Sequence, residues 1–195
     1  MSITCLPDDL LDAALQTAAE VLIECLQTIT ELRRARVAIL GGMAVRHHLP
    51  DYRRNSDVDV LLFRPDYPIN YRLIRKQLRN NGRKAKRSYL VQVDIIPDYL
   101  PPYLPAQAMA LEDVDRSHLP FVGPLDVLAY KVHCSSMRSS LDKQNQDARD
   151  AVTLWQTFYA AKKQRDAIAS GVDLMAEYSR WCWMRKWRLR QWVNA

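Results

Sequence analysis

The chain is poor in cysteine and glycine and has no long apolar run. Its 195 residues include four scattered cysteines with no C-x-x-C pair, which excludes the common zinc and dithiol motifs. No stretch approaches the roughly 20 apolar residues that span a bilayer, so no transmembrane segment is expected. The start, MSITCLPDDLLDAAL, lacks the basic residues and apolar stretch of a secretory signal. We therefore expect an intracellular, cytoplasmic protein with reduced thiols.

The chain does have an ordinary apolar content and an excess of basic residues. Hydrophobic residues make up 48% of it and charged residues 26%, which is enough for a buried core. The formal net charge is +6 and the pI about 9.2. A positive surface favours polyanionic partners such as nucleotides or RNA, although many mildly basic enzymes bind no nucleic acid.

Hydrophobic periodicity predicts alternating helices and strands. Residues 8–34 carry apolar side chains at a sustained spacing of three and four, and Pro7-Asp8-Asp9 suits a helix start. The other expected elements are a strand at 37–40, a short helix at 43–49, a strand at 57–63, a helix at about 69–80, a strand at 89–96, a helix from Pro124, a helix at about 145–163 and a last helix in the Trp- and Arg-rich end.

This order of elements predicts an α/β (α+β) fold, in which a small mixed sheet is joined to a helical N-terminal segment and a helical C-terminal half. Prolines 97, 101, 102 and 105 mark an irregular crossing between the two halves. We therefore expect residues 1–123 to form the sheet core with its N-terminal helix. Residues 124–195 are expected to form a helical part packed on that core.

Three aspartates are the candidate catalytic and metal-binding residues. Asp57 and Asp59 are two apart on a predicted strand, so their side chains leave the same face about 6–7 Å apart. Two carboxylates that close repel each other unless a cation lies between them, and oxygen ligands suit Mg²⁺. Asp94 lies in another apolar strand, and all three carboxylates converge if the two strands pair. The alternative is a chance D-x-D pair on a surface strand, with Asp94 accepting a salt bridge.

A Gly-Gly pair precedes these aspartates at the end of the first predicted strand. Gly41 and Gly42 open a short helix, where bare backbone N–H groups and a positive helix end can receive a phosphate. Alone, such a turn is weak support. The ordered set of strand, Gly-Gly, helix, Arg53/Arg54-x-Ser56-Asp57-x-Asp59 and a later strand with Asp94 is more specific.

The segment GGMAVRHHLPDYRRNSDVDVLLF, residues 41–63, resembles the signature of the DNA polymerase β-type nucleotidyltransferase superfamily. The likeness is closest to the minimal members grouped with abortive-infection and toxin nucleotidyltransferases. Their pattern runs Gly-Gly-x-Ala, an Arg, a Ser or Thr, Asp-x-Asp and a third Asp on an adjacent strand. The resemblance covers roughly residues 36–155.

The resemblance implies a Mg²⁺- or Mn²⁺-dependent reaction on an NTP such as ATP. Asp57 and Asp59 would bind the metal, while Asp94 would share it and help deprotonate the acceptor hydroxyl. The residues implied in holding the nucleotide are Gly41, Gly42, Arg54, Ser56, Lys131 and Arg138. An NMP would move to RNA, tRNA, a protein or a small molecule, and pyrophosphate would leave. The alternative is a catalytically inactive nucleotide- or RNA-binding protein of the same fold.

The relatives also carry a helix with Lys and Arg, followed by an Asp-rich helix start. The residues that fit this arrangement here are Lys131, Arg138, Lys143, Asp147 and Asp150. Lys131 and Arg138 are seven apart, so we expect them on one helix face, where both can reach the phosphates.

Two basic regions offer further surfaces. Residues 72–87 contain eight basic residues and no acidic one, so this stripe can follow an RNA backbone or form a solvated helix face. Residues 180–192 mix tryptophan with arginine. That mixture suits nucleic acid, a membrane surface or packing on the helical half.

Overall fold

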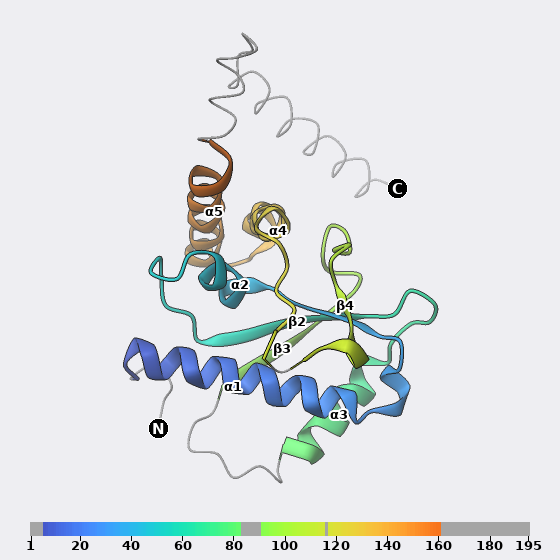
Figure 1. Cartoon of the computed structure of the whole chain (residues 1–195). Coiled ribbons are helices and arrows are strands. Elements are labelled where there is room, and N and C mark those ends of the chain that lie inside the picture. The colour runs from blue at the N-terminus through green and yellow to red at the C-terminus, as the bar shows by residue number, and fades with distance from the viewer. Residues whose placement is uncertain (1–5, 83–90, 116, 161–195) are drawn as a thin grey trace, which may run out of the picture. The chain divides into compact units, whose positions relative to one another are not determined.

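The computed structural model describes residues 6–82, 91–115 and 117–160, which are the coloured parts of Figure 1. The chain divides into two compact units, residues 1–151 and 152–195. The division predicted between residues 123 and 124 falls inside the first unit and stays a prediction.

A four-stranded mixed sheet forms the centre of the first unit, in the order β3-β2-β1-β4. The strands are β1 (Arg36–Ile39), β2 (Asp57–Phe63), β3 (Gln92–Pro97) and β4 (Met109–Ala110). β1 runs antiparallel to both β2 and β4, whereas β2 and β3 are parallel. The predicted mixed-sheet α+β fold is confirmed. The short strand β4, inside the proline-rich crossing, was not expected.

The N-terminal helix α1 (Asp8–Gln27) covers one face of this sheet, next to α3 (Tyr71–Gly82) (Figure 1). Its buried side chains recur at intervals of three and four, and they are Leu11, Leu15, Ala19, Leu22, Ile23 and Leu26. The predicted end at about residue 34 is wrong, because the helix stops at Gln27 and a separate 3-10 turn follows. They form one core with the buried residues of β1 and β2 and with Ile74 of α3. This core makes the sheet a rigid support for the side chains on its other face.

On that other face lie α2 (Gly41–His48) and α4 (Pro124–Met137), followed along the chain by α5 (Leu141–Trp155) (Figure 1). A five-residue π-helical turn, Gln156–Ala160, continues α5. Two single 3-10 turns, Thr30–Leu32 and Leu111–Asp113, connect other elements.

The structure corrects several predicted boundaries. α2 begins at Gly41 itself, α3 begins at Tyr71, and α5 begins four residues before the predicted Asn145. The prediction that Lys131 and Arg138 share one helix face is wrong, because α4 ends at Met137 and Arg138 has an extended ψ of 140°. The Gln144 side chain donates to the Arg138 carbonyl at 2.6 Å, which satisfies this end of α4 from the next helix.

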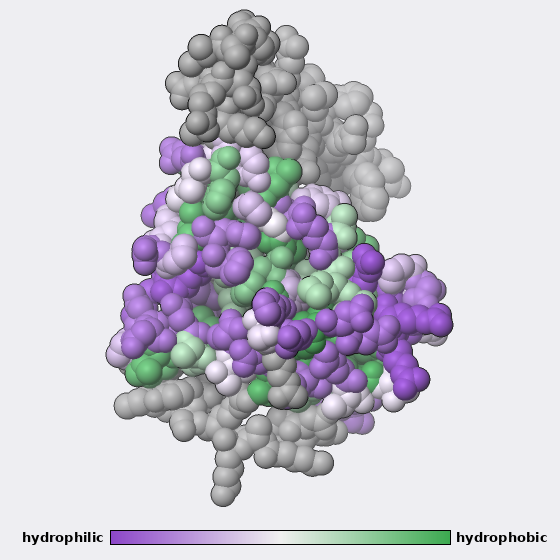
Figure 2. All heavy atoms as spheres, in the orientation of Figure 1, coloured by the Kyte–Doolittle hydropathy of each residue, from purple (hydrophilic) through white to green (hydrophobic). Residues whose placement is uncertain are grey.

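No helix in the described part of the chain is long and apolar enough to cross a membrane. In Figure 2, hydrophilic and hydrophobic residues are interspersed over the face shown. The segment of residues 180–192 lies outside the described residues, as do residues 83–87 of the basic stripe.

Candidate active site

Asp57, Asp59 and Asp94 come together on two neighbouring parallel strands. The register of β2 and β3 pairs Asp59 directly with Asp94, so these side chains leave the same face of the sheet. One carboxylate oxygen from each of the three aspartates lies within 4.8 Å of the others. The strand pairing on which the three-carboxylate hypothesis depended is therefore present. We call this group the carboxylate site.

The first turn of α2 lies directly against the carboxylate site. Gly41 has a positive φ of 64°, and a Cβ atom placed on it would collide with the Asp59 carboxylate. A side chain at position 41 is therefore excluded both by conformation and by space. The Leu40 N–H donates to the Asp59 carbonyl at 2.9 Å and fixes this close approach. The start of a helix thus meets a cluster of acids, which suits a ligand that carries both phosphate and metal.

The carboxylate site carries excess negative charge. Burial raises the pKa of Asp59 to about 6, and the charges of Asp57 and Asp94 add to this rise. Lys131 and Arg138 act in the opposite direction on the same pKa. Among the described residues, Asp57 and Asp59 make no ion pair, and Asp94 accepts a hydrogen bond from the neutral Gln92 amide at 2.8 Å. A bound cation would relieve this repulsion.

The donor set fits a hard divalent cation. All three candidate ligands offer carboxylate oxygens within 4.8 Å of one another, and the three contribute no sulfur or imidazole. Oxygen-only coordination of this kind suits Mg²⁺ and Mn²⁺ rather than Zn²⁺. Asp57, Asp59 and Asp94 could therefore hold the metal that the sequence motif predicts.

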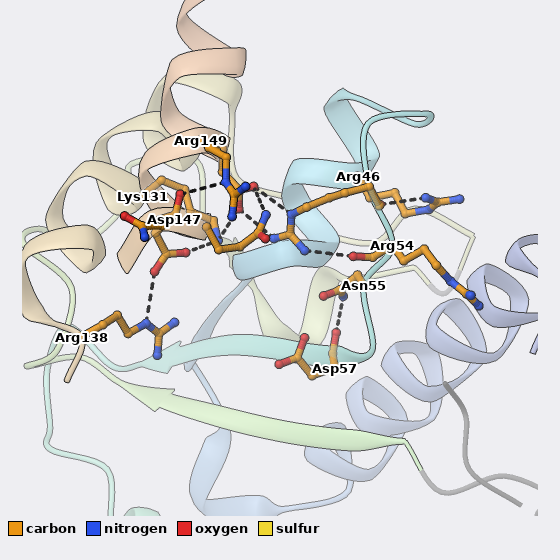
Figure 3. Close-up of polar contacts among 12 residues, drawn as sticks. Arg46, Arg54, Asn55, Asp57, Lys131, Arg138, Asp147 and Arg149 are labelled. Carbon is orange, nitrogen blue, oxygen red and sulfur yellow. Dashed lines mark hydrogen bonds and ion pairs between the residues drawn. The ribbon is translucent and has the colours of Figure 1, made fainter. Parts of the chain in front are cut away.

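A second group of charged side chains lies beside this site (Figure 3). We call it the ion-pair cluster, and its members are Arg53, Lys131, Arg138, Asp147 and Asp150. Lys131 is buried, with its Nζ 2.6 Å from Asp147 Oδ1 and 2.8 Å from Asp150 Oδ2. The predicted phosphate ligand is thus paired with two carboxylates inside the protein.

Arg138 is the more accessible cation of the two predicted phosphate ligands. Its side chain is 46% exposed, and its Nε lies 3.1 Å from Asp147 Oδ2. In the described part of the chain its Nη groups make no hydrogen bond. In Figure 3, Arg138 lies on the side of Asp147 that faces the strand carrying Asp57. One edge of this guanidinium is held by Asp147, and the other is open to an anion.

The structure does not bring Arg54 to the carboxylate site. Its Nε lies 2.9 Å from Asp8 Oδ1, and its guanidinium also donates to the Leu6 carbonyl, so it anchors the start of α1. Ser56 is exposed in the loop immediately before Asp57. The neighbour Arg53, rather than Arg54, is the arginine that faces α5.

Asn55 is a buried polar residue that the sequence interpretation missed. Its Nδ2 donates to the Asp57 carbonyl at 2.5 Å, and its Oδ1 lies 2.2 Å from where a Cβ on Gly42 would be. An asparagine in a turn before a strand is a typical residue for such a local side-chain to backbone bond. That signal is present in the sequence, but it does not reveal that α2 packs against the amide.

Only part of the basic stripe of residues 72–87 can be placed. Arg72, Arg75 and Lys76 are exposed on α3. An Nη of Arg75 donates to the carbonyl of Ile95, the residue after Asp94, at 3.2 Å. This contact brings one basic side chain to the strand that carries Asp94.

The similarity of this chain to the known protein described below is distant. No protein-family model matches the chain, and no curated protein matches it. A solved structure, described as an antigenic nucleotidyltransferase-like protein from Paracoccidioides brasiliensis, is similar to it at 16% sequence identity and a TM-score of 0.49. The match covers 85% of this chain and 90% of the other.

Proposed function

We propose that this protein is a Mg²⁺- or Mn²⁺-dependent nucleotidyltransferase that moves an NMP from an NTP to an acceptor and releases pyrophosphate. The observation that carries the proposal is the convergence of Asp57, Asp59 and Asp94 against the glycine turn of α2. The pattern of the sequence and the geometry of the site both support these residues. We expect the reaction in the cytoplasm, where NTPs and Mg²⁺ are abundant.

Asp57, Asp59 and Asp94 would hold the divalent metal through their clustered oxygens. Bound there, the metal supplies positive charge to the phosphates and lowers the pKa of an attacking hydroxyl. Asp94 lies on the edge strand β3, from which it can also accept the proton of the acceptor. The raised pKa of Asp59 reflects burial and a mutual repulsion that a cation would neutralise.

The triphosphate would lie between the first turn of α2 and the cations of the ion-pair cluster. The first N–H groups of a helix have no partner within it, and neither Gly41 nor Gly42 carries a side chain of its own there. Arg138 offers its open edge, Lys131 adds charge from within the protein, and Ser56 offers a hydroxyl at the entrance to β2.

The transfer itself makes one bond and breaks one. The acceptor oxygen bonds to the α-phosphorus, while the bond from that phosphorus to the oxygen bridging the β-phosphate breaks. Pyrophosphate leaves with the electron pair of the broken bond. The acceptor proton passes to Asp94 and from there to water, so the aspartate returns to its starting state.

Among RNA or tRNA, a protein and a small molecule, we propose RNA as the acceptor, and the basic side chains of α3 support this choice. The exposed Arg72, Arg75 and Lys76 form one side of α3, and Arg75 contacts the strand that carries Asp94. Basic side chains at helical spacing can follow a phosphate backbone. This observation supports an RNA strand that passes from α3 round the edge strand β3 to the carboxylate site on the other face of the sheet.

A pyrophosphate-release assay tests the proposal. Each NTP is supplied with Mg²⁺ or Mn²⁺ and with total RNA or a panel of small-molecule acceptors. We expect release that requires both the metal and an acceptor and that ends when EDTA is added. The catalytically inactive alternative predicts NTP binding in calorimetry that persists in EDTA, with no pyrophosphate under any condition.

A further inference from the structure

A buried two-bond ion pair joins α5 to the loop that leads into β2. Arg53 Nε lies 2.8 Å from Asp150 Oδ1, and Arg53 Nη2 lies 2.7 Å from Asp150 Oδ2. Asp150 is fully buried and also contacts Lys131 Nζ at 2.8 Å. Burial opposes its ionisation, but the hydrogen bonds of Arg53 and the charge of Lys131 leave the Asp150 pKa below its ordinary value. Asp150 therefore stays ionised and keeps both of its bonds to the Arg53 guanidinium.

Arg53 is fixed by more than this pair. Its Nη1 donates to the Arg54 carbonyl at 3.0 Å, and its own carbonyl accepts from Arg46 Nη1 at 2.9 Å. Its Nη2 lies 3.2 Å from where a Cβ on Gly42 would be. The guanidinium is thus held between the carboxylate of α5 and the backbone of the first turn of α2.

The contacts continue from Arg53 to the metal-binding strand. Asn55, two residues on, is buried against Gly42 and donates to the Asp57 carbonyl at 2.5 Å. Neighbouring groups therefore lead from Asp150 through its bonds to Arg53, past the Cα of Gly42, to Asn55 and its bond to the backbone of Asp57. Asp57 is the first residue of β2, where a strand is least restrained by its own ladder.

We propose that Arg53 and Asp150 are a positioning pair that holds residues 53–57 against α2, so that the Asp57 carboxylate meets Asp59 and Asp94 in the arrangement a divalent cation needs. The inference rests on the proposed function, because the cation is the one that the reaction uses. The three carboxylates repel one another, and a free loop would let Asp57 swing away. A planar guanidinium that makes two parallel bonds fixes direction as well as distance, which a lysine does not.

The chain offers a matched control in a second arginine–aspartate pair. Arg46 on α2 binds Asp12 on α1, with Nε 2.6 Å from Oδ1 and Nη2 2.6 Å from Oδ2. This pair has the same two-bond form but joins α1 to α2 and includes no residue of 53–57. D12N leaves in place the bond from Arg46 to the Arg53 carbonyl. A general loss of helix packing would therefore appear in D12N, whereas a loss of Asp57 positioning would not.

The experiment measures Mn²⁺ binding to the full chain without nucleotide, by electron paramagnetic resonance titration, for wild type, R53K, D12N and D57N. We expect R53K to weaken Mn²⁺ binding by about tenfold, the scale for losing a residue that orients a metal ligand. D12N should bind as wild type does, and D57N should bind least. Thermal unfolding of each variant defines the temperature at which all are fully folded, and the titrations are made there.

A purely structural role for the pair predicts a lower unfolding temperature for R53K with an unchanged Mn²⁺ affinity of the folded protein, and that result overturns the inference. If R53K does not fold, N55A decides the question, because it removes the last contact of the path and leaves every charge in place. Wild-type affinity in N55A then overturns the inference. If wild type itself binds Mn²⁺ no better than D57N does, the proposed function fails as well, so the two failures are distinguishable.

Discussion

Two groups of charges lie side by side in this protein and differ in how their charges are compensated. In the ion-pair cluster, the buried Asp147 and Asp150 are each within hydrogen-bond distance of two cationic side chains. In the carboxylate site, Asp57 and Asp59 make no ion pair among the described residues, and the pKa of Asp59 rises to about 6. Compensated charges hold elements together. Uncompensated ones indicate a place prepared for a ligand.

The largest effect is expected at the uncompensated group. D57N removes the charge of a proposed metal ligand without changing its size, so we expect kcat for pyrophosphate release to fall roughly a thousandfold, about 4 kcal/mol in the activation barrier. The fold should be retained, since Asp57 makes no ion pair in the described part of the chain. The matched control is D113N, at an exposed aspartate of a 3-10 turn. Full activity in D57N would exclude the carboxylate site as the catalytic centre.

Substitution in the ion-pair cluster should lower the free energy of unfolding. K131M leaves Asp150 with Arg53 and Asp147 with Arg138 as their remaining cationic partners, inside the protein. Removing one partner of a buried pair costs about 3–5 kcal/mol when a charge is left uncompensated. Because each aspartate keeps an arginine, we expect the free energy of unfolding in urea to fall by about 1–3 kcal/mol. Lys143 is exposed on α5, so K143M should change it by less than about 0.5 kcal/mol. Equal unfolding curves for the two variants would contradict a stabilising role for Lys131.

Much of this comparison could be predicted from the sequence, and the missing part has a physical reason. Local periodicity and the Asp-x-Asp spacing located β2 and β3 and the three carboxylates, because strand alternation fixes which side chains share a face. Arg53 and Asp150 are 97 residues apart, and no local pattern indicates which of two adjacent arginines reaches a buried aspartate. The extended backbone of Arg138 likewise depends on how α5 packs after α4, and not on the spacing from Lys131.

Gly41 and Gly42, in the first turn of α2, lie between the carboxylate site and the ion-pair cluster. A methyl group added at Gly41 tests whether this close packing is needed. G41A must adopt a φ near 64° and would collide with the Asp59 carboxylate, so we expect a loss of about 1–3 kcal/mol in stability. We also expect weaker Mn²⁺ binding by calorimetry, because Asp59 has to move. Gly123 is the control, because its φ is −63° and the atoms nearest to a Cβ placed on it belong to the flexible Gln107 side chain, at 3.0 Å or more. G123A should therefore unfold and bind metal as wild type does.

The smallest expected effect is a pH-dependent change in the unfolding temperature that comes from Asp59 of the carboxylate site. Because burial and the neighbouring acids raise the Asp59 pKa to about 6, its ionisation costs the folded state more than the unfolded one. The stability that protonated Asp59 contributes is fully present below about pH 4, the ordinary carboxyl range, and is lost as pH rises through about 6.

D59N should therefore raise the unfolding temperature by a few degrees at pH 7.5 and by nothing at pH 4, measured in EDTA by calorimetry. Adding Mg²⁺ at pH 7.5 should reverse the order, because the ion stabilises only the protein that keeps its three carboxylates. D113N, at an exposed acid, should have the unfolding temperature of wild type under every condition. Equal unfolding temperatures of D59N and wild type at both pH values would show that the three carboxylates do not repel one another.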